Sequence, residues 1–137
     1  MIERGKIRNR DFASTLRDFS GLKWGRITPT DIDAFLDFKN KAFVFIESKH
    51  KNGIPAFFNE EKRNGQKLAL ERLVDSVSVP AILIVAEHSG EFGSDIELGS
   101  NSVIKYRSKK LWLTPKKAIS VRALIEAFLK RERLEIL

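Results

Sequence analysis

Apolar residues recur along this chain with two periods, which predict helices near both ends and strands between them. Three segments carry apolar residues at the spacing of an amphipathic helix, and we expect helices at 9–25, 65–77 and 120–134. Ser120 is expected to be the N-cap of the last helix, because its hydroxyl can accept a hydrogen bond from a free backbone N–H. The apolar stripes are expected to lie in the core: Phe12, Leu16 and Phe19 in the first helix, Leu68, Leu73 and Val77 in the second, and Val121, Leu124, Ile125, Phe128 and Leu129 in the third.

Shorter apolar segments between these helices predict strands. They lie at about 32–38, 42–49, 81–88, 102–107 and 110–113. Residues 81–88 are almost entirely apolar, which is typical of a strand buried on both faces of a sheet. A strand, a helix and a buried strand in succession predict a parallel crossover, and the expected order of elements is therefore αββαβ.

This order predicts an α/β fold, with a mixed sheet flanked by helices. We expect a single domain over 1–137, with its core at about 9–88 and a basic C-terminal extension at 100–137. Gly and Pro residues within 50–64 predict a long, mobile loop after the second strand.

The first two predicted strands form a hairpin around residues 39–41, where an asparagine tolerates the positive φ of a tight turn. A turn centred there places Asp33 opposite Glu47 and Asp31 opposite Lys49, whereas a two-residue loop would shift this register by one. Because side chains alternate along a strand, Glu47 and Lys49 share one face. The hairpin is therefore expected to gather carboxylates and an ammonium at one end of the sheet.

The composition narrows the class of protein. With 42% hydrophobic and 31% charged residues, the chain is typical of soluble globular proteins. It has no cysteine, which excludes disulfides, thiolate catalysis and cysteine metal sites. No apolar run approaches the roughly 18–20 residues that cross a bilayer, and the N-terminal residues lack the apolar segment of a secretory signal. We expect an intracellular, cytoplasmic protein with no membrane partner.

The net charge of +7 lies entirely in the C-terminal segment. Residues 1–99 hold 15 basic and 15 acidic residues, whereas residues 100–137 hold 10 basic and 3 acidic ones. Within the balanced part, residues 1–26 hold 7 basic and 3 acidic residues and residues 27–99 hold 8 and 12. Both ends are therefore basic around an acidic centre, which favours a polyanionic partner such as DNA, although a basic surface can also serve solubility. The candidate nucleic-acid-binding residues are Lys105, Arg107, Lys109, Lys110, Lys116 and Lys117.

Asp33, Glu47 and Lys49 together meet the requirements of a metal-dependent hydrolase. Two neighbouring carboxylates repel each other near a core unless a cation compensates them, and Mg²⁺ or Mn²⁺ prefers oxygen ligands. A lysine beside them can orient or deprotonate the attacking water. The alternative is a solvated ion pair at the end of a strand. The two histidines, His50 and His88, are far apart in the sequence and are expected to have structural or solvated positions.

The pattern "DID" at 31–33, thirteen further residues and "ESK" at 47–49 resembles the PD-(D/E)XK nuclease superfamily, in particular small phage and prophage members. The αββαβ order is also that of this restriction-endonuclease-like and Holliday-junction-resolvase-like group. The chain departs from the family pattern in two ways. No proline directly precedes the aspartate, and the middle residue of the second motif is Ser48 where the family usually has an apolar one.

The resemblance implies a role for each matching residue. Asp33 and Glu47 would bind Mg²⁺ or Mn²⁺ together with the backbone carbonyl of Ser48, and Lys49 would act on the water. Gln66 and Asp31 would support the site, and Asp31 remains an alternative to Asp33 as the metal ligand. An acid from the first helix would be Glu3 or Asp11.

These observations predict a metal-dependent DNA endonuclease. Nothing in the sequence is typical of a base-reading motif, which favours recognition of branched, junction or single-stranded DNA over a fixed sequence. Cleavage of such substrates usually requires two active sites, and we therefore expect a homodimer. A non-cleaving nucleic-acid-binding accessory protein of the same fold and an RNA nuclease are the alternatives.

Overall fold

The computed structural model describes residues 18–62, 64–90 and 96–134. Contacts between Cα atoms divide the chain into two compact units, Met1–Asp31 and Ile32–Leu137. The expected single domain over 1–137 stays a prediction. The second unit, however, includes the whole segment that the sequence assigns to an extension.

The described part of the first unit contains one 3₁₀ turn, η1 (Ser20–Leu22), in place of the end of the predicted helix. Trp24 and Ile27 then form an isolated antiparallel bridge around Gly25, whose φ of 62° suits glycine. The turn η1 buries none of its side chains, and Phe19, which precedes it, is 44% exposed, so the expected place of Phe19 in the core is wrong. Phe12 and Leu16 lie outside the described residues.

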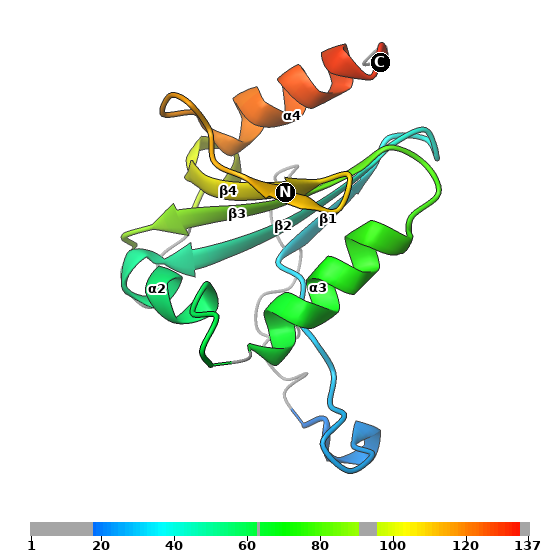
Figure 1. The fold of residues 1–137 in the computed structure, drawn as a ribbon, viewed down its shortest axis with the longest axis vertical. Coiled ribbons are helices and arrows are strands. Elements are labelled where there is room, and N and C mark those ends of the chain that lie inside the picture. The colour runs from blue at the N-terminus through cyan, green and yellow to red at the C-terminus, as the bar shows by residue number, and fades with distance from the viewer. Residues whose placement is uncertain (1–17, 63, 91–95, 135–137) are drawn as a thin grey trace, which may run out of the picture. The chain divides into compact units, whose positions relative to one another are not determined.

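The second unit is built on a five-stranded mixed sheet with the strand order β1-β2-β3-β4-β5. The strands are β1 (Ala34–Asp37), β2 (Phe43–His50), β3 (Ala81–His88), β4 (Ser102–Ser108) and β5 (Leu111–Leu113). β2 and β3 are parallel, as predicted, and the other neighbouring pairs are antiparallel. Helix α4 (Val121–Arg131) covers one face, while α2 (Ile54–Phe57) and α3 (Gly65–Ser76) lie on the other (Figure 1). The predicted α/β class is confirmed.

The hairpin between β1 and β2 has the register that a turn centred on Asn40 predicts. Its ladder runs from Asp37 opposite Phe43 to Ala34 opposite Ile46, so the next position beyond the ladder places Asp33 level with Glu47. Both central turn residues, Lys39 and Asn40, have positive φ (56° and 63°), as type I′ turns require.

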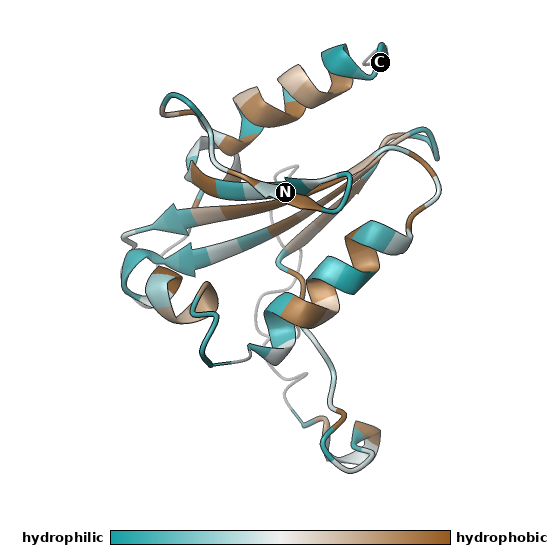
Figure 2. Ribbon diagram, viewed as in Figure 1, coloured by the Kyte–Doolittle hydropathy of each residue, from teal (hydrophilic) through white to brown (hydrophobic). Residues whose placement is uncertain are grey.

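Each face of the sheet has its own apolar cluster, since the side chains of β2 and β3 alternate between the two faces. On one face, Val44, Ile46, Ile82 and Ile84 pack against α4. The stripe predicted for this helix is buried in full, and Ser120 Oγ accepts from Ala123 N at 3.1 Å as the expected N-cap. Figure 2 shows β2 and β3 ending in hydrophilic residues after their apolar middles.

The core on the opposite face corrects the prediction for α3. Leu70 and Val74 are the buried residues of this helix, whereas Leu73 is 36% exposed. Leu70 and Val74 are four residues apart and pack on Phe45, Leu83 and Val85. Gln66 lies one further helical step before Leu70, so the face that buries these two residues also carries the Gln66 side chain toward the sheet.

The segment 50–64 is not the long loop that the sequence predicts. It contains the turn η2 (Lys51–Gly53) and α2, and Phe57 of α2 is only 1% exposed. Burying this aromatic ring in the α3-side core fixes the segment directly after β2. The turn η3 (Leu98–Ser100) likewise leads into β4 within the same compact unit.

Candidate active site

Asp33 and Ser48 join the two strands of the hairpin just beyond its ladder. Asp33 precedes β1 and is exposed, and its Oδ2 accepts a hydrogen bond from the Ser48 backbone N–H at 2.7 Å. This contact joins residues that are fifteen positions apart. The carboxylate of Asp33 is therefore held at the carboxyl-terminal half of β2, beside Glu47.

Glu47 is the one charged residue among the described ones that is buried, with 3% of its surface exposed. Its Oε1 accepts from Gln66 Nε2 at 3.0 Å and lies 3.1 Å from Lys49 Nζ. Its Oε2 is buried and has no hydrogen-bond partner among the residues that the structure describes. Burial raises the pKa of this carboxyl, and the negative charge of Asp33 raises it further, while Lys49 and Gln66 oppose these effects.

Lys49 completes a triangle of polar side chains. Its Nζ donates to Gln66 Oε1 at 2.6 Å, so the amide of Gln66 bridges the ammonium and the carboxylate of Glu47. The ammonium also lies 5.3 Å from the ring centre of Phe57, beneath the site. Three elements, β2, α2 and α3, thus hold Lys49 in one position.

The structure brings together four of the residues that the sequence nominates: Asp33, Glu47, Lys49 and Gln66. Ser48 lies among them, with its N–H on Asp33 and its Oγ donating to Asn101 Oδ1 at 2.9 Å. Asp31 is the last residue of the first unit, and its supporting role stays a prediction. Glu3 and Asp11 lie outside the described residues.

The side chains at the site fit a hard divalent cation. A buried carboxylate oxygen without a partner, next to a second carboxylate, is an electrostatic arrangement that a cation would relieve. Asp33 and Glu47 are the acidic residues that would hold it. Within 18–62, 64–90 and 96–134, no group of three or more His, Asp or Glu residues is placed to hold a metal, so backbone oxygen and water would supply the other ligands.

His50 and His88 end the parallel strands β2 and β3 side by side, with ring centres 5.6 Å apart. Each Nδ1 accepts a hydrogen bond of 3.2 Å from a backbone N–H two residues further on, at Asn52 and Gly90. Both rings therefore help to fix the chain where it leaves the sheet.

The basic residues of the C-terminal segment have different surroundings. Arg107 forms a bidentate pair with the carboxylate of Asp75, with N–O distances of 2.9 and 2.7 Å, and this pair raises the pKa of the Arg107 guanidinium. Arg107 Nη1 also lies 3.7 Å from Glu71 Oε2. Its charge is thus neutralised within the fold, which argues against its predicted role as a nucleic-acid contact. Lys105 lies over the ring of Phe58 at 5.2 Å.

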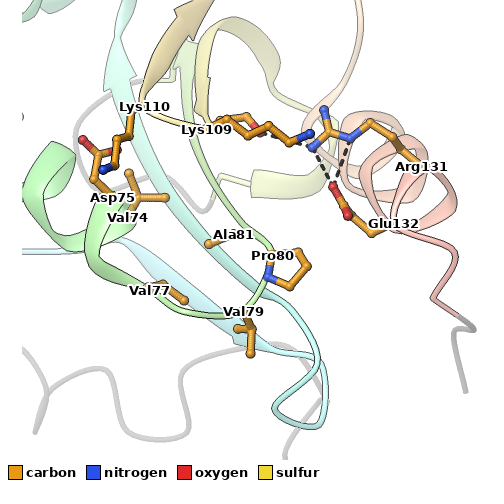
Figure 3. Close-up of a pocket in the computed structure, with 11 residues that line it drawn as sticks. Val74, Asp75, Val77, Val79, Pro80, Ala81, Lys109, Lys110, Arg131 and Glu132 are labelled. Carbon is orange, nitrogen blue, oxygen red and sulfur yellow. Dashed lines mark hydrogen bonds and ion pairs between the residues drawn. The ribbon is translucent and has the colours of Figure 1, made fainter.

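The remaining four predicted contacts are exposed. Lys109 and Lys110 form the turn between β4 and β5, at the end of the sheet away from Glu47. They line a pocket of about 200 Å³ with Asp75, Arg131 and Glu132, as Figure 3 shows. Lys116 and Lys117 follow β5. Lys109 and Lys110 therefore do not gather at the carboxylates.

Two residues of the site region were not predicted from the sequence. Phe57 lies in a segment rich in Gly, Pro, Asn and charged residues, which predicts a loop. The apolar doublet Phe57-Phe58 is the signal that could have indicated burial there. Asn101 contacts Ser48 from 53 positions away in the chain, and no local pattern predicts this contact.

Comparison with known proteins finds no matching family model, no similar curated protein and no similar solved structure. The fold and the site together define an α/β protein with a buried, lysine-paired glutamate at the carboxyl end of a central strand. Among the residues that the structure describes, no helix has the length and apolar character needed to span a bilayer.

Proposed function

We propose that this chain is a metal-dependent nuclease that hydrolyses phosphodiester bonds in DNA. The observation that carries the proposal is the environment of the Glu47 carboxylate. This carboxylate is buried, lies beside the charge of Asp33 and has one oxygen without a hydrogen-bond partner in the described part of the chain. An ion pair that served only stability would be expected to satisfy both oxygens, because a buried, unpaired carboxylate oxygen costs about 1–3 kcal/mol.

A divalent metal held by Asp33 and Glu47 would stabilise negative charge on a phosphate oxygen. The chain's own groups have separate tasks. Lys49 is within 3.1 Å of Glu47 and can orient, as an ammonium, a water molecule that approaches the same carboxylate, whereas as a neutral amine it could accept the proton of that water. Gln66 holds the two charged groups in a fixed relation through its amide.

The topology supports a restriction-endonuclease-like fold within the α/β class. A β-hairpin, a helix and a parallel strand follow one another as β1, β2, α3 and β3, and the candidate residues lie where the hairpin and the helix meet. The net charge of +7 supports a polyanionic substrate. Selectivity for branched, junction or single-stranded DNA, and action as a homodimer, are parts of the same proposal.

One observation favours a second candidate, a nucleic-acid-binding accessory protein of this fold that does not cleave. Only Asp33 and Glu47 converge among the described acidic residues, and no third carboxylate joins them. A site with two acidic ligands can bind a metal weakly or not at all. In that case the basic surface would still bind nucleic acid, but no bond would be broken.

Incubation of the purified protein with junction, single-stranded and duplex DNA, and with matched RNA, separates these candidates. With Mg²⁺ or Mn²⁺ we expect cleavage of DNA, and we expect none with EDTA or with Glu47→Ala. An Arg72→Gln variant, changed on the exposed side of α3, is the control and should cut like the wild type. Salt-dependent binding of all DNA substrates without cleavage would favour the accessory protein.

A further inference from the structure

The sheet places Lys105 level with Glu47. Glu47 pairs with Val85 across the parallel ladder, and Val85 pairs with Lys105 across the antiparallel one. Side chains that face each other across a ladder point to the same side of the sheet. Two strand spacings amount to about 10 Å, so the backbones of Glu47 and Lys105 lie about that far apart.

A β-bulge gives Lys105 this orientation. Val103 pairs with Ala86, and Lys105 pairs with Val85. The register shifts between these two pairs, so Ile104 is the extra residue of β4. Without the bulge, Ile104 would face Val85 and Lys105 would point to the α4 side. The contact between the Lys105 ammonium and Phe58, which follows α2, confirms that the side chain lies on the α3 side.

The ammonium of Lys105 can also bind a further anionic ligand. Among the described residues, Lys49, Lys67 and Arg107 on this side of the sheet each have a carboxylate partner, whereas the Lys105 ammonium forms no ion pair or hydrogen bond with them. Its contact is the ring of Phe58 at 5.2 Å, and a contact with an aromatic face leaves N–H donors for another ligand. Lys105 is therefore a cation that no acidic side chain among the described residues neutralises.

We propose that Lys105 binds a backbone phosphate of the substrate close to the phosphate that is cleaved at Glu47. Every nucleotide of a polynucleotide strand carries a phosphate, so a phosphate near the cleaved one can come within reach of the Lys105 ammonium. The substrate would then cross β2, β3 and β4 on the α3 side of the sheet. This inference rests on the proposed nuclease function, but the binding contact can be measured without cleavage.

The competing explanation is that Lys105 only packs its aliphatic stem on Phe58. Lys105→Met keeps a flexible stem of similar length and removes the charge, while Lys105→Arg keeps the charge. Lys130→Met is a matched control, because Lys130 is an exposed lysine of α4, on the other face of the sheet. Thermal unfolding curves of the three variants establish that each is folded at the temperature of the binding assay.

The test is the salt dependence of binding, measured by fluorescence anisotropy with a labelled single strand and a duplex of equal length in EDTA. For Lys105→Met we expect binding about 3- to 10-fold weaker at low salt. The slope of log Kobs against log salt should fall by about 0.7 for the single strand and 0.9 for the duplex, the loss of one phosphate contact. Lys105→Arg should restore the wild-type slope, and Lys130→Met should leave it unchanged.

Three results would overturn the inference: a wild-type slope in Lys105→Met, an equal loss of slope in Lys130→Met, or no binding of either oligonucleotide by the wild type. A free mononucleotide that displaces the labelled strand at equal phosphate concentration would also contradict a polynucleotide contact. Failure of the nuclease function has a different signature. In that case the slopes differ as expected in EDTA, but Mn²⁺ produces no cleavage.

Discussion

Gln66 connects Glu47 to Lys49 through both ends of one amide, donating to Glu47 Oε1 at 3.0 Å and accepting from Lys49 Nζ at 2.6 Å. The amide orientation follows from these partners, since a carboxylate only accepts and an ammonium only donates. We expect Gln66→Leu to lower the cleavage rate about 10- to 100-fold, as is typical when a group that orients a site is removed. Single-turnover kinetics at saturating DNA measure this effect.

Binding of DNA in EDTA should be unchanged in Gln66→Leu, because Gln66 positions the site and does not contact the phosphate in our proposal. Arg72→Gln, on the exposed side of the same helix, controls for a general effect of altering α3. An equal loss of rate in both variants would contradict a specific role for Gln66.

Glu47→Gln is expected to stabilise the metal-free protein at neutral pH. Burial, and then Asp33, raise the pKa of this carboxyl above its ordinary value of 4.5, which means that the folded state favours the protonated form. Ionisation therefore costs stability. The cost is absent below pH 4.5, grows as the pH rises toward the folded-state pKa and is complete above it.

Thermal unfolding in EDTA at several pH values checks this prediction. At pH 7–8 we expect Glu47→Gln to melt about 2–5 °C above the wild type. The difference should shrink as the pH falls toward 4. A variant that melts below the wild type at neutral pH would indicate that the pairing of Glu47 with Lys49 outweighs its burial.

The variants Asp33→Asn and Asp31→Asn should differ in whether Mn²⁺ stabilises the protein. Asp33 is held beside Glu47 by the Ser48 N–H, so Asp33→Asn should abolish both cleavage and the increase in Tm caused by Mn²⁺. A ligand at 100 times its dissociation constant stabilises the folded state by about 2.7 kcal/mol, which raises the Tm by several degrees. Asp31→Asn should keep this increase. The reverse pattern would identify Asp31 as the ligand.

Ser48→Ala tests whether the serine hydroxyl or the backbone matters at this position. The mutation removes the 2.9 Å hydrogen bond to Asn101 but keeps the N–H that Asp33 accepts. We expect a loss of about 1 kcal/mol in the free energy of unfolding and little change in the cleavage rate. Urea denaturation and initial rates measure the two quantities. A large loss of rate without a loss of stability would assign the hydroxyl itself to the reaction.

The strands and the hairpin that carries the candidate site could be predicted from the amino-acid sequence. The apolar runs fixed β2 and β3, because a strand buried on both faces needs apolar residues throughout. A turn centred on Asn40 is one of the two registers that the sequence allows, and it is the one that the hairpin adopts and that places Asp33 level with Glu47. Local chemistry also identified Ser120 as the N-cap of α4.

The tertiary structure alone decided which face of α3 is buried, and hence that Gln66 reaches Glu47. Leu68, Leu70, Leu73 and Val74 offer more than one apolar stripe, and only packing against β2 and β3 selects Leu70 and Val74.

The contacts of the basic residues could not be predicted from the sequence either. The pairing of Arg107 with Asp75 and the bulge that turns Lys105 toward the α3 side both depend on which strands are neighbours. These contacts join residues distant in the chain, so no local period or motif encodes them.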